Sequence, residues 1–338
     1  MESFDVIIIG AGPAGLKCAE ILGKSNQKVL LLEKNKEIGP KPCGGLMTDQ
    51  GLTYLQQSIG EKKFNKLILN SILGKKEIEI QDSPLYTITR EKLAQFQLKK
   101  LKKFRNLTIR TSSIATKIDP DFIIVNGQKI KFNFLVGADG SSSIVRRYLG
   151  LKTNKLGLAL HYKVPTKKYS EIELFFNTHL FGPYYAWILP SEDYVSIGTG
   201  CDPKIFPAKK LIDNFNRWLT SKNIDLSKAK YEAHLLNYDY QGIEFGKIFL
   251  IGDAAGLIYD FTGEGIHPAL ISGEEVGEKI INPHHLISID EILKKKKSQE
   301  KLTKYLILSG PLRAVLHELV IFLIKSKVFR KKVVKVFA

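Results

Sequence analysis

The sequence predicts an α/β fold in which a mostly parallel sheet with helices is combined with an antiparallel sheet and a helical C-terminus. Two observations predict it. First, three apolar runs each end in a glycine cluster and lead into a helical stretch, which is typical of buried parallel strands. Second, residues 156–200 form several short apolar and aromatic runs separated by turn residues, which is typical of antiparallel strands.

The first of these junctions is at the N-terminus. Phe4–Ile9 is an apolar run that leads into Gly10, Gly12 and Gly15, in the spacing G-x-G-x-x-G. The first glycine permits a tight turn, the second lets a pyrophosphate approach the backbone, and the third lets the next helix pack close to the strand. A helix from Pro13 and Ala14 onward would point its first amides at the phosphates. This half of the chain is therefore predicted to be Rossmann-like and to bind a dinucleotide.

A second apolar strand supports this prediction. Val29–Leu32 ends in Glu33, close to the position at which a carboxylate accepts hydrogen bonds from an adenosine ribose. Lys34 and the Gly- and Pro-rich loop that ends at Leu46 follow. Within the loop, Cys43 precedes Gly44 and Gly45, so its backbone can approach a flat group, although an incidental small residue in a loop would also fit.

The next region contains a helix with an unusual first turn. We expect a helix over about 48–60, strands between 64 and 88, and a second helix over about 90–104 with Thr89 as its N-cap. Arg90 lies in that first turn, where the helix dipole disfavours a cation. This indicates that Arg90 serves a ligand. Strands at 107–110 and 122–125 follow, the latter in a hairpin through Asn126-Gly127.

The two later junctions repeat the geometry of the first. Residues 132–137 lead into Ala138-Asp139-Gly140 and a hydroxyl-rich helix start, and residues 247–251 lead into Gly252-Asp253-Ala254-Ala255-Gly256. A turn at Thr262-Gly263-Glu264-Gly265-Ile266 then opens a helix to about Ile281. Between these junctions we expect strands at 158–164, 172–176, 184–189 and 194–200, and a helix over about 209–222.

Composition limits the class of protein. The chain has 338 residues, 44% hydrophobic and 25% charged, as expected of a globular protein with a core. Asp5 interrupts the first apolar run early, so we expect no signal peptide, and no apolar stretch reaches the ~18 residues of a membrane-spanning helix. Three scattered cysteines indicate neither disulfides nor a metal site, and fit a cytoplasmic protein.

The charge is concentrated at the C-terminus. The formal net charge is +17, and residues 284–338 hold 13 Lys and Arg against 4 Asp and Glu. This pattern fits an ordinary solvated surface, or an anionic partner that is a membrane surface and not a nucleic acid. In the second case we expect residues 312–337, which mix apolar side chains with Lys and Arg, to lie on an anionic bilayer as a peripheral helix.

Together the three junctions resemble those of the FAD-dependent oxidoreductases of the p-hydroxybenzoate hydroxylase superfamily, in the same order along the chain. The resemblance implies that Asp253 holds a ribityl hydroxyl of FAD, that Asp139 lies near the pyrophosphate or orders its own loop, and that Arg90 contacts the cofactor. It also implies that the turn at Gly263, Gly265 and Ile266 directs helix amides at the flavin N1–C2=O edge, where the reduced ring is negative.

Within the superfamily the sequence most resembles the geranylgeranyl reductase family. Lys41-Pro42-Cys43-Gly44-Gly45 is similar to its cysteine loop, Tyr185-Ala186-Trp187-Ile188-Leu189-Pro190 to its Tyr-x-Trp-x-Phe-Pro signature, and Thr262–Ile266 to its Thr-Gly-Glu-Gly-Ile turn. Leu189 departs from the family's Phe, and the chain is short for the family.

This resemblance implies reduction of a carbon–carbon double bond in a prenyl chain of a lipid or isoprenoid, by flavin hydride transfer and protonation. Cys43 is the first candidate for the proton donor and Tyr185 the second, while Cys43 acting only on pocket shape is the alternative. Tyr185, Trp187 and Pro190 would bind the substrate. NAD(P)H or a ferredoxin-like protein would supply the electrons. A flavin monooxygenase or halogenase, or a non-catalytic FAD-binding protein at the membrane, are the competing functions.

The motifs also predict how the chain is divided. The FAD-binding domain is expected to be discontinuous and to consist of residues 1–47, 86–155 and 241–282. Residues 48–85 and 156–240 would form the antiparallel substrate domain, and 283–338 the basic helical region.

Overall fold

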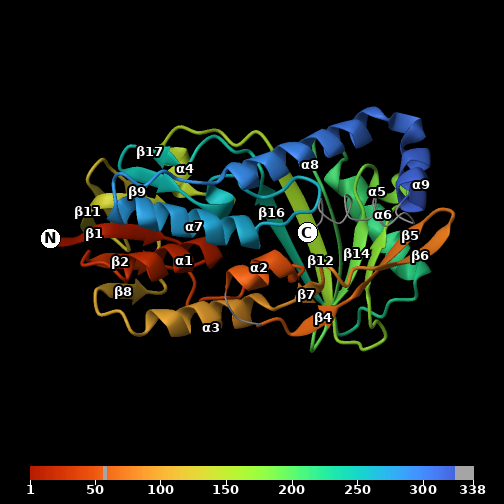
Figure 1. Cartoon of the computed structure of the whole chain (residues 1–338), viewed down its shortest axis with the longest axis horizontal. Coiled ribbons are helices and arrows are strands. Elements are labelled where there is room, and N and C mark those ends of the chain that lie inside the picture. The colour runs from red at the N-terminus through yellow and green to blue at the C-terminus, as the bar shows by residue number, and fades with distance from the viewer. Residues whose placement is uncertain (56–58, 324–338) are drawn as a thin grey trace.

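The computed structural model describes residues 1–55 and 59–323. It confirms the predicted α/β fold: the molecule is elongated, with the sheet that contains the N-terminus at one end and the antiparallel sheet at the other (Figure 1). The described helices are α1 Pro13–Leu22, α2 Asp49–Tyr54, α3 Arg90–Leu101, α4 Ile144–Tyr148, α5 Thr178–Phe181, α6 Ala208–Ser221, α7 Ile266–Ile281, α8 Asp290–Leu308 and α9 Arg313–Leu323.

The sheet at the N-terminal end has eight strands, with the order β17-β18-β11-β1-β2-β8 and with β10 and β9 added beside β11. These strands are β1 Glu2–Ile9, β2 Val29–Leu32, β8 Leu107–Arg110, β9 Ala115–Ile118, β10 Phe122–Val125, β11 Gln128–Gly137, β17 Glu244–Phe245 and β18 Ile248–Leu250. β1 pairs in parallel with both β2 and β11, and β11 with β18. The carboxyl ends of the three strands that precede a glycine junction therefore lie side by side.

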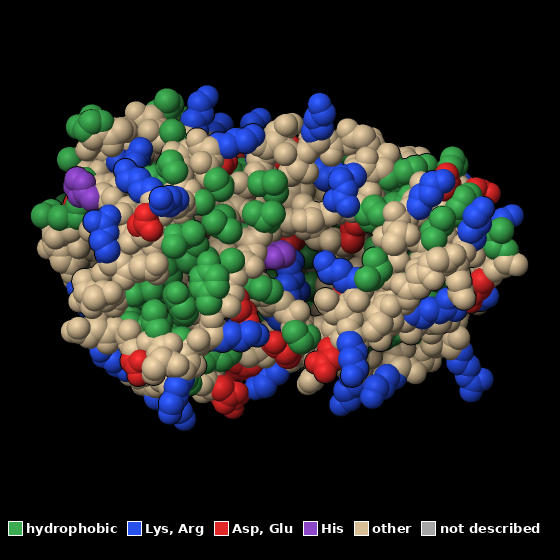
Figure 2. Space-filling model, turned by 180° about the vertical axis from the view of Figure 1, so that it is seen from behind, with side chains coloured by type: hydrophobic (Ala, Val, Ile, Leu, Met, Phe, Trp, Pro, Cys, Tyr) green, Lys and Arg blue, Asp and Glu red, His purple; other side chains and the backbone are tan. Residues whose placement is uncertain are grey.

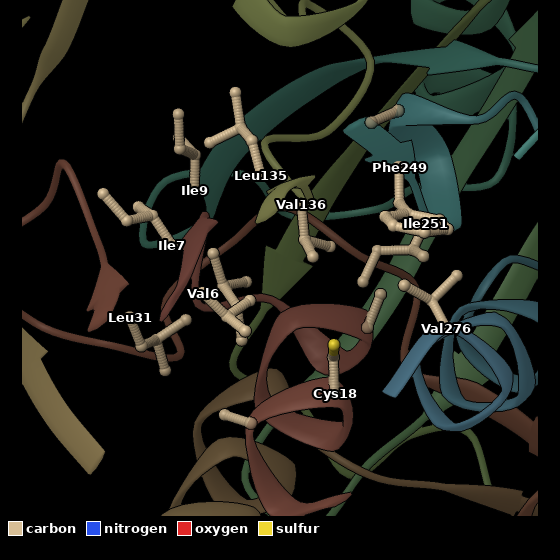
Figure 3. Close-up of a cluster of buried hydrophobic side chains, with 14 of the residues drawn as sticks. Val6, Ile7, Ile9, Cys18, Leu31, Leu135, Val136, Phe249, Ile251 and Val276 are labelled. Atoms are coloured by element: carbon tan, nitrogen blue, oxygen red, sulfur yellow. The ribbon is translucent and has the colours of Figure 1, made fainter. Parts of the chain in front are cut away.

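Apolar side chains pack on both faces of this sheet and hold it in the core. Val6, Ile7, Ile8 and the whole of β2 are fully buried, as near-continuous apolar runs of parallel strands require. Figure 3 shows side chains of β1, β2, β11, β18 and α7 in one cluster, with Cys18 pointing toward it from α1. Burial raises the pKa of the Cys18 thiol, which makes it an inert core residue.

Helices α1 and α7 approach each other unusually closely. A Cβ at Gly273 would lie 2.3 Å from the Ala14 carbonyl oxygen, and one at Gly277 would lie 2.7 Å from the Ile21 Cβ. Two glycines in the middle and later part of α7 thus let this helix lie directly against α1, from Ala14 to Ile21. A Cβ at Gly252 would lie 3.1 Å from the Ala14 Cβ, so the third junction also lies beside the first.

The antiparallel sheet has seven strands in the order β16-β12-β15-β14-β13-β5-β6. They are β5 Lys66–Ser71, β6 Gly74–Glu79, β12 Leu156–Val164, β13 Ile172–Phe175, β14 Ala186–Pro190, β15 Val195–Cys201 and β16 Lys230–Asn237. The four strands expected between 158 and 200 are confirmed. The parallel pairing of β5 with β13, which attaches the hairpin 66–79 to this sheet, has no counterpart in the local sequence pattern.

A small sheet and a short helix connect the two ends. β3 Leu46–Thr48, β7 Leu85–Thr87 and β4 Lys62–Phe64 pair in the order β3-β7-β4. The helix expected over 48–60 is wrong in length, because α2 ends at Tyr54 with Leu55 as its C-cap. Residues 56–58 lie outside the described part of the chain. The division into domains stays a prediction.

Helix α8 spans both ends of the molecule. In Figure 1 it runs along the upper edge from the α7 side to the antiparallel sheet, where α9 turns away from it. Within the described residues no single helix is long and apolar enough to cross a membrane. The segment predicted to lie on a bilayer, residues 312–337, is described only as far as Leu323, and its six cations from Lys325 to Lys335 lie outside the described residues.

Candidate active site

One cavity of about 560 Å³ joins the glycine junctions to the antiparallel sheet and to α8. The face seen in Figure 2 is hollowed near its middle, and basic, acidic and histidine side chains gather around this hollow. The cavity brings together most of the predicted site residues: Gly12, Pro13, Ala14, Cys43, Gly44, Arg90, Tyr185, Trp187, Gly252, Asp253, Gly263, Gly265 and Ile266.

The first glycine loop has the geometry of an anion cradle. Gly10 has φ +105°, and a Cβ at Gly15 would lie 2.0 Å from the Gly10 carbonyl oxygen, so both positions require glycine. At Gly12, by contrast, a Cβ would meet no atom within 4 Å, which leaves open space for a ligand against the backbone. No side chain caps the start of α1. Its first amides therefore remain available to a phosphate.

Two predicted carboxylates lie beside this cradle and bond to backbone amides of the junction loops. Glu33 accepts from Ala11 N at 3.1 Å and from Asn35 N at 2.9 Å. Asp139 Oδ2 accepts from Ile144 N at 2.6 Å, so it orders the loop that leads into α4. Burial raises the pKa of Asp139. Glu33, Lys34, Asp139, Gly10 and Gly15 are not among the residues that line the cavity.

Asp253 forms an ion pair across the cavity. Its Oδ2 lies 2.9 Å from Nζ of Lys41, in the cysteine loop. Burial opposes ionisation of Asp253, but the Lys41 ammonium outweighs it and holds the pKa below its usual value. Asp253 is therefore ionised at neutral pH and can accept a hydroxyl hydrogen bond. Lys41 belongs to the cysteine loop motif, but the sequence pattern does not indicate that it pairs with Asp253, 212 positions away.

Two further polar groups indicate that the cavity is built for a ligand. Arg90 Nε and His234 Nε2 are buried and have no hydrogen-bond partner among the described residues. Burial, together with nearby Lys41, lowers the pKa of His234 to about 4, so this residue is neutral at pH 7. Orphaned polar atoms of this kind are costly unless a ligand or water satisfies them. With the open backbone at Gly12 and the ionised Asp253, they fit FAD.

The cysteine loop rests on the antiparallel sheet. Cys43 Sγ accepts from Gly45 N at 3.4 Å, and Gly45 has φ +77°. A Cβ at Gly44 would lie 3.0 Å from Leu189 Cδ1 and 3.7 Å from Trp187 Nε1. Gly44 thus lets the loop lie directly on Leu189 and Trp187, and Cys43 faces the same cavity as both.

Strand β14 and Tyr185, the residue before it, form one wall of the cavity. Tyr185 lies between the rings of Phe176 and Phe261, with centroids 5.5 Å from each, and its hydroxyl donates to the Thr262 carbonyl at 3.4 Å. Burial raises the pKa of this phenol, which makes it a weaker acid. Pro190 lies at the strand end, where its carbonyl accepts from Thr87 Oγ1.

Trp187 is held by a polar chain that the sequence analysis missed. Its Nε1 donates to Ser196 Oγ at 3.2 Å, and Ser196 Oγ lies 2.8 Å from Nδ1 of buried His161. His161 Nε2 lies 3.3 Å from Glu232 on the next strand. Burial lowers the pKa of His161 to about 4. These residues sit on four neighbouring strands, so only the sheet register brings them together.

The sequence is similar to those of known oxidoreductases and reductases. The sequence profile of the pyridine nucleotide-disulphide oxidoreductase family matches residues 4–164. The chain is 27% identical to digeranylgeranylglycerophospholipid reductase 3 of Methanosphaera stadtmanae, covering 90% of this chain and 82% of that protein. It is 26% identical to the geranylgeranyl diphosphate reductase of Synechocystis, covering 82% and 75%.

Solved structures share the fold. A geranylgeranyl bacteriochlorophyll reductase-like protein from Thermoplasma acidophilum superposes with a TM-score of 0.73 at 20% identity, covering 93% of this chain and 92% of that one. The flavin-dependent brominase Bmp2 superposes with a TM-score of 0.68 at 16% identity, covering 99% and 93%.

We expect Asp253→Ala to weaken FAD binding. The substitution removes a charged acceptor from a ribityl hydroxyl, which is worth about 1.5–3 kcal/mol, or roughly 10- to 100-fold in Kd. Titration of apoprotein by quenching of FAD fluorescence would measure this. Asp82→Ala, an exposed carboxylate on the β6–β7 connection, is the control. An unchanged Kd for Asp253→Ala would remove Asp253 from the cofactor site.

Proposed function

We propose that this chain, an FAD-dependent oxidoreductase related to the geranylgeranyl reductases, reduces carbon–carbon double bonds of a prenyl chain carried by a lipid or isoprenoid. The observation that carries this proposal is the single cavity that runs from the glycine junctions to an apolar wall. Its volume of about 560 Å³ lies within the usual range for small-molecule sites. The names of the similar reductases support the same substrate class.

The cofactor end of the cavity fits FAD through groups of known position. The amides at the start of α1 would hold the pyrophosphate, Asp253 a ribityl hydroxyl, and the start of α7 the pyrimidine edge of the ring. When bound, FAD supplies the hydride. Arg90 and His234, whose buried nitrogens have no partner among the described residues, would donate to the cofactor or its immediate surroundings.

The opposite wall fits an apolar chain. Leu67, Ile172, Leu174, Trp187, Leu189 and Phe261 line it, drawn from the antiparallel sheet and the loop before α7. Each Å² of apolar chain that they cover contributes about 25 cal/mol. An isolated alkene offers no polar handle, so shape and burial must position it. The Ser196–His161–Glu232 chain behind Trp187 would keep this wall rigid.

Two alternatives use the same fold. A monooxygenase or halogenase would need oxygen at the flavin. The similarity of this chain to the brominase Bmp2 concerns the fold alone. A non-catalytic FAD-binding protein would have no use for an apolar wall beside the cofactor. The electron donor, NAD(P)H or a ferredoxin-like protein, remains a prediction from the family resemblance.

The site also favours a substrate that arrives from a membrane. Thr303, Lys304 and Ile307 of α8 line the cavity, and Lys304 is exposed, so this helix forms part of the cavity wall at the molecular surface. Around it lies an exposed apolar corner, formed by the end of α8, by α9 and by the tip of the β5–β6 hairpin. Its members include Leu73, Tyr305, Leu308, Leu312 and Val315, which are 62–81% exposed. Lys76 Nζ, 3.0 Å from the Ile321 carbonyl oxygen, joins the hairpin to α9. This corner would rest on an anionic bilayer, as a peripheral contact.

Anaerobic turnover tests the function. Protein with dithionite-reduced FAD should be reoxidised by a geranylgeranyl lipid, and mass spectrometry should show a gain of two hydrogens for each double bond reduced. Oxygen consumption coupled to substrate modification would favour the monooxygenase instead. No reoxidation by any prenyl lipid would leave the non-catalytic alternative.

We expect Cys43→Ser to retain FAD and fold while changing the rate of alkene reduction or the double bond that is reduced. The reason is that Cys43 faces the cavity on a loop whose glycines bring it against Trp187. Product mapping by mass spectrometry measures the pattern. An unchanged rate and pattern would demote Cys43 to a loop residue.

The proposed membrane contact predicts that charged substitutions in the apolar corner weaken vesicle binding. Leu312→Glu with Val315→Glu should weaken binding to anionic vesicles at least about 10-fold, since two apolar side chains worth about 1.5 kcal/mol or more each can no longer enter the bilayer. Leu286→Glu is the control, because Leu286 is even more exposed but lies between α7 and α8. Binding should weaken with salt. Equal binding by the two variants in co-sedimentation would contradict the contact.

A further inference from the structure

Alkene reduction poses a requirement that the proposed function leaves open. A hydride reaches one carbon, and a proton must reach the other, inside an apolar cavity. Four of the titratable groups that line the cavity are poor donors at neutral pH. Lys41 keeps Asp253 ionised, burial leaves His161 and His234 neutral with pKa values of about 4, and burial raises the pKa of Tyr185.

Glu264 differs from all of these in position. It lies between Gly263 and Gly265 in the turn that opens α7, and its side chain, 11% exposed, lines the cavity. The same turn holds the second aromatic candidate, because Tyr185 donates to the Thr262 carbonyl and the Glu264 amide donates to Thr262 Oγ1 at 3.4 Å. On the cofactor side, a Cβ at Gly265 would lie 3.4 Å from Asp253 Oδ1. Glu264 is thus located between the predicted ribityl site and the aromatic wall.

Among the residues that the structure describes, the carboxyl group of Glu264 forms an ion pair with Lys295. Oε2 lies 3.3 Å from Nζ of Lys295 on α8, and Oε1 lies 3.5 Å from Thr48 Oγ1 on β3. The other titratable groups packed around it are His267 on α7 and Tyr259 below the turn. Burial, with Lys295 as a second cause, lowers the pKa of His267 to about 4, and burial raises the pKa of Tyr259. Both are neutral at pH 7, so Lys295 sets the local charge.

Lys295 connects this carboxyl group to water. The side chain of Lys295 is 18% exposed and that of Glu264 is 11% exposed, so their ion pair is not fully shielded from water. Burial raises the pKa of Glu264 above its ordinary value even with Lys295 beside it. A carboxyl group whose pKa is raised toward the working pH combines a useful protonated fraction with sufficient acid strength.

Resting on the proposed function, we propose that Glu264 is the general acid that protonates the alkene carbon that does not receive the hydride, and that Lys295 stabilises the carboxylate left behind. The Glu264 O–H bond breaks as the new C–H bond forms, and the electron pair for the other new C–H bond comes with the hydride. The carboxylate then regains a proton from water at the Lys295 end. Cys43 and Tyr185 shape the alkene pocket.

The test compares four proteins that carry dithionite-reduced FAD: the unaltered chain, Glu264→Gln, Glu264→Asp, and the control Glu275→Gln. Glu275 lies on α7, the helix that follows the Glu264 turn, and pairs with His285 at 2.9 Å, outside the cavity lining. At saturating prenyl lipid, Glu264→Gln should reoxidise at least about 100-fold more slowly. Glu264→Asp should recover part of the rate, and Glu275→Gln should match the unaltered chain.

The pH profile distinguishes an acid from a structural residue. Because the donor must be protonated, the rate should fall as pH rises through the pKa of Glu264, and Glu264→Gln should lose this limb. Lys295→Met removes the cation that favours the carboxylate, so the limb should move to higher pH. Infrared titration of ¹³C-labelled glutamate carboxyls, which needs no turnover, should show one protonated band that is absent in Glu264→Gln and moves with Lys295→Met.

The outcomes separate the two proposals. If the unaltered chain reduces no prenyl lipid, the proposed function fails. If it does reduce one, either of two results would show that Glu264 is not the acid. One is that Glu264→Gln retains the rate of the unaltered chain within about threefold, and the other is that the fall of rate with pH is not shifted in Lys295→Met. Should Glu264→Gln fail to bind FAD, the infrared and pH shifts in Lys295→Met decide the matter.

Discussion

The site depends on the close contact of α1 with the carboxyl end of β1 and with α7. Gly15 lies against the Gly10 carbonyl, and Gly273 lies against the Ala14 carbonyl, at distances that exclude any Cβ. This contact places the start of α1, the Asp253 loop and the start of α7 around one space. The two helix N-termini give one part of that space a positive potential, and the ionised Asp253 gives a nearby part a negative charge. A dinucleotide with a negative pyrophosphate and a hydroxylated linker matches this arrangement.

The apolar half of the cavity follows from a different constraint. Gly198 has no side chain where the Trp187 ring and the His161 Cβ approach, at 2.5 and 2.6 Å from a virtual Cβ. Trp187 can therefore lie flat along the sheet, anchored to Ser196, while Gly44 of the cysteine loop packs on it. Helix α8 closes the side, since its buried Lys296 bonds to the Ile258 carbonyl and to Asp260. The proposed alkene reduction requires both this wall and the cofactor cradle.

Much of the fold could be predicted because its signals are local. The glycine spacings, the N-cap Thr89 and the Asn126-Gly127 turn act within a few residues, and each is found where it was expected. The pairs that determine chemistry are not local. Lys41 meets Asp253 and Lys295 meets Glu264 only because the sheets and α8 are packed together. His161 meets Ser196 only through the register of β12 with β15. The glycines that flank Glu264 indicate a turn, but the local pattern does not indicate that the Glu264 side chain meets Lys295 on α8.

The most direct test of the central claim is the crystal structure of the purified protein with FAD and a geranylgeranyl lipid under anaerobic conditions. The account predicts electron density for a long apolar ligand between the flavin ring and Trp187, with one double bond over the ring and within reach of Glu264. A cavity that excludes the chain, or a chain that lies only on the outer surface of α8 and α9, would contradict it.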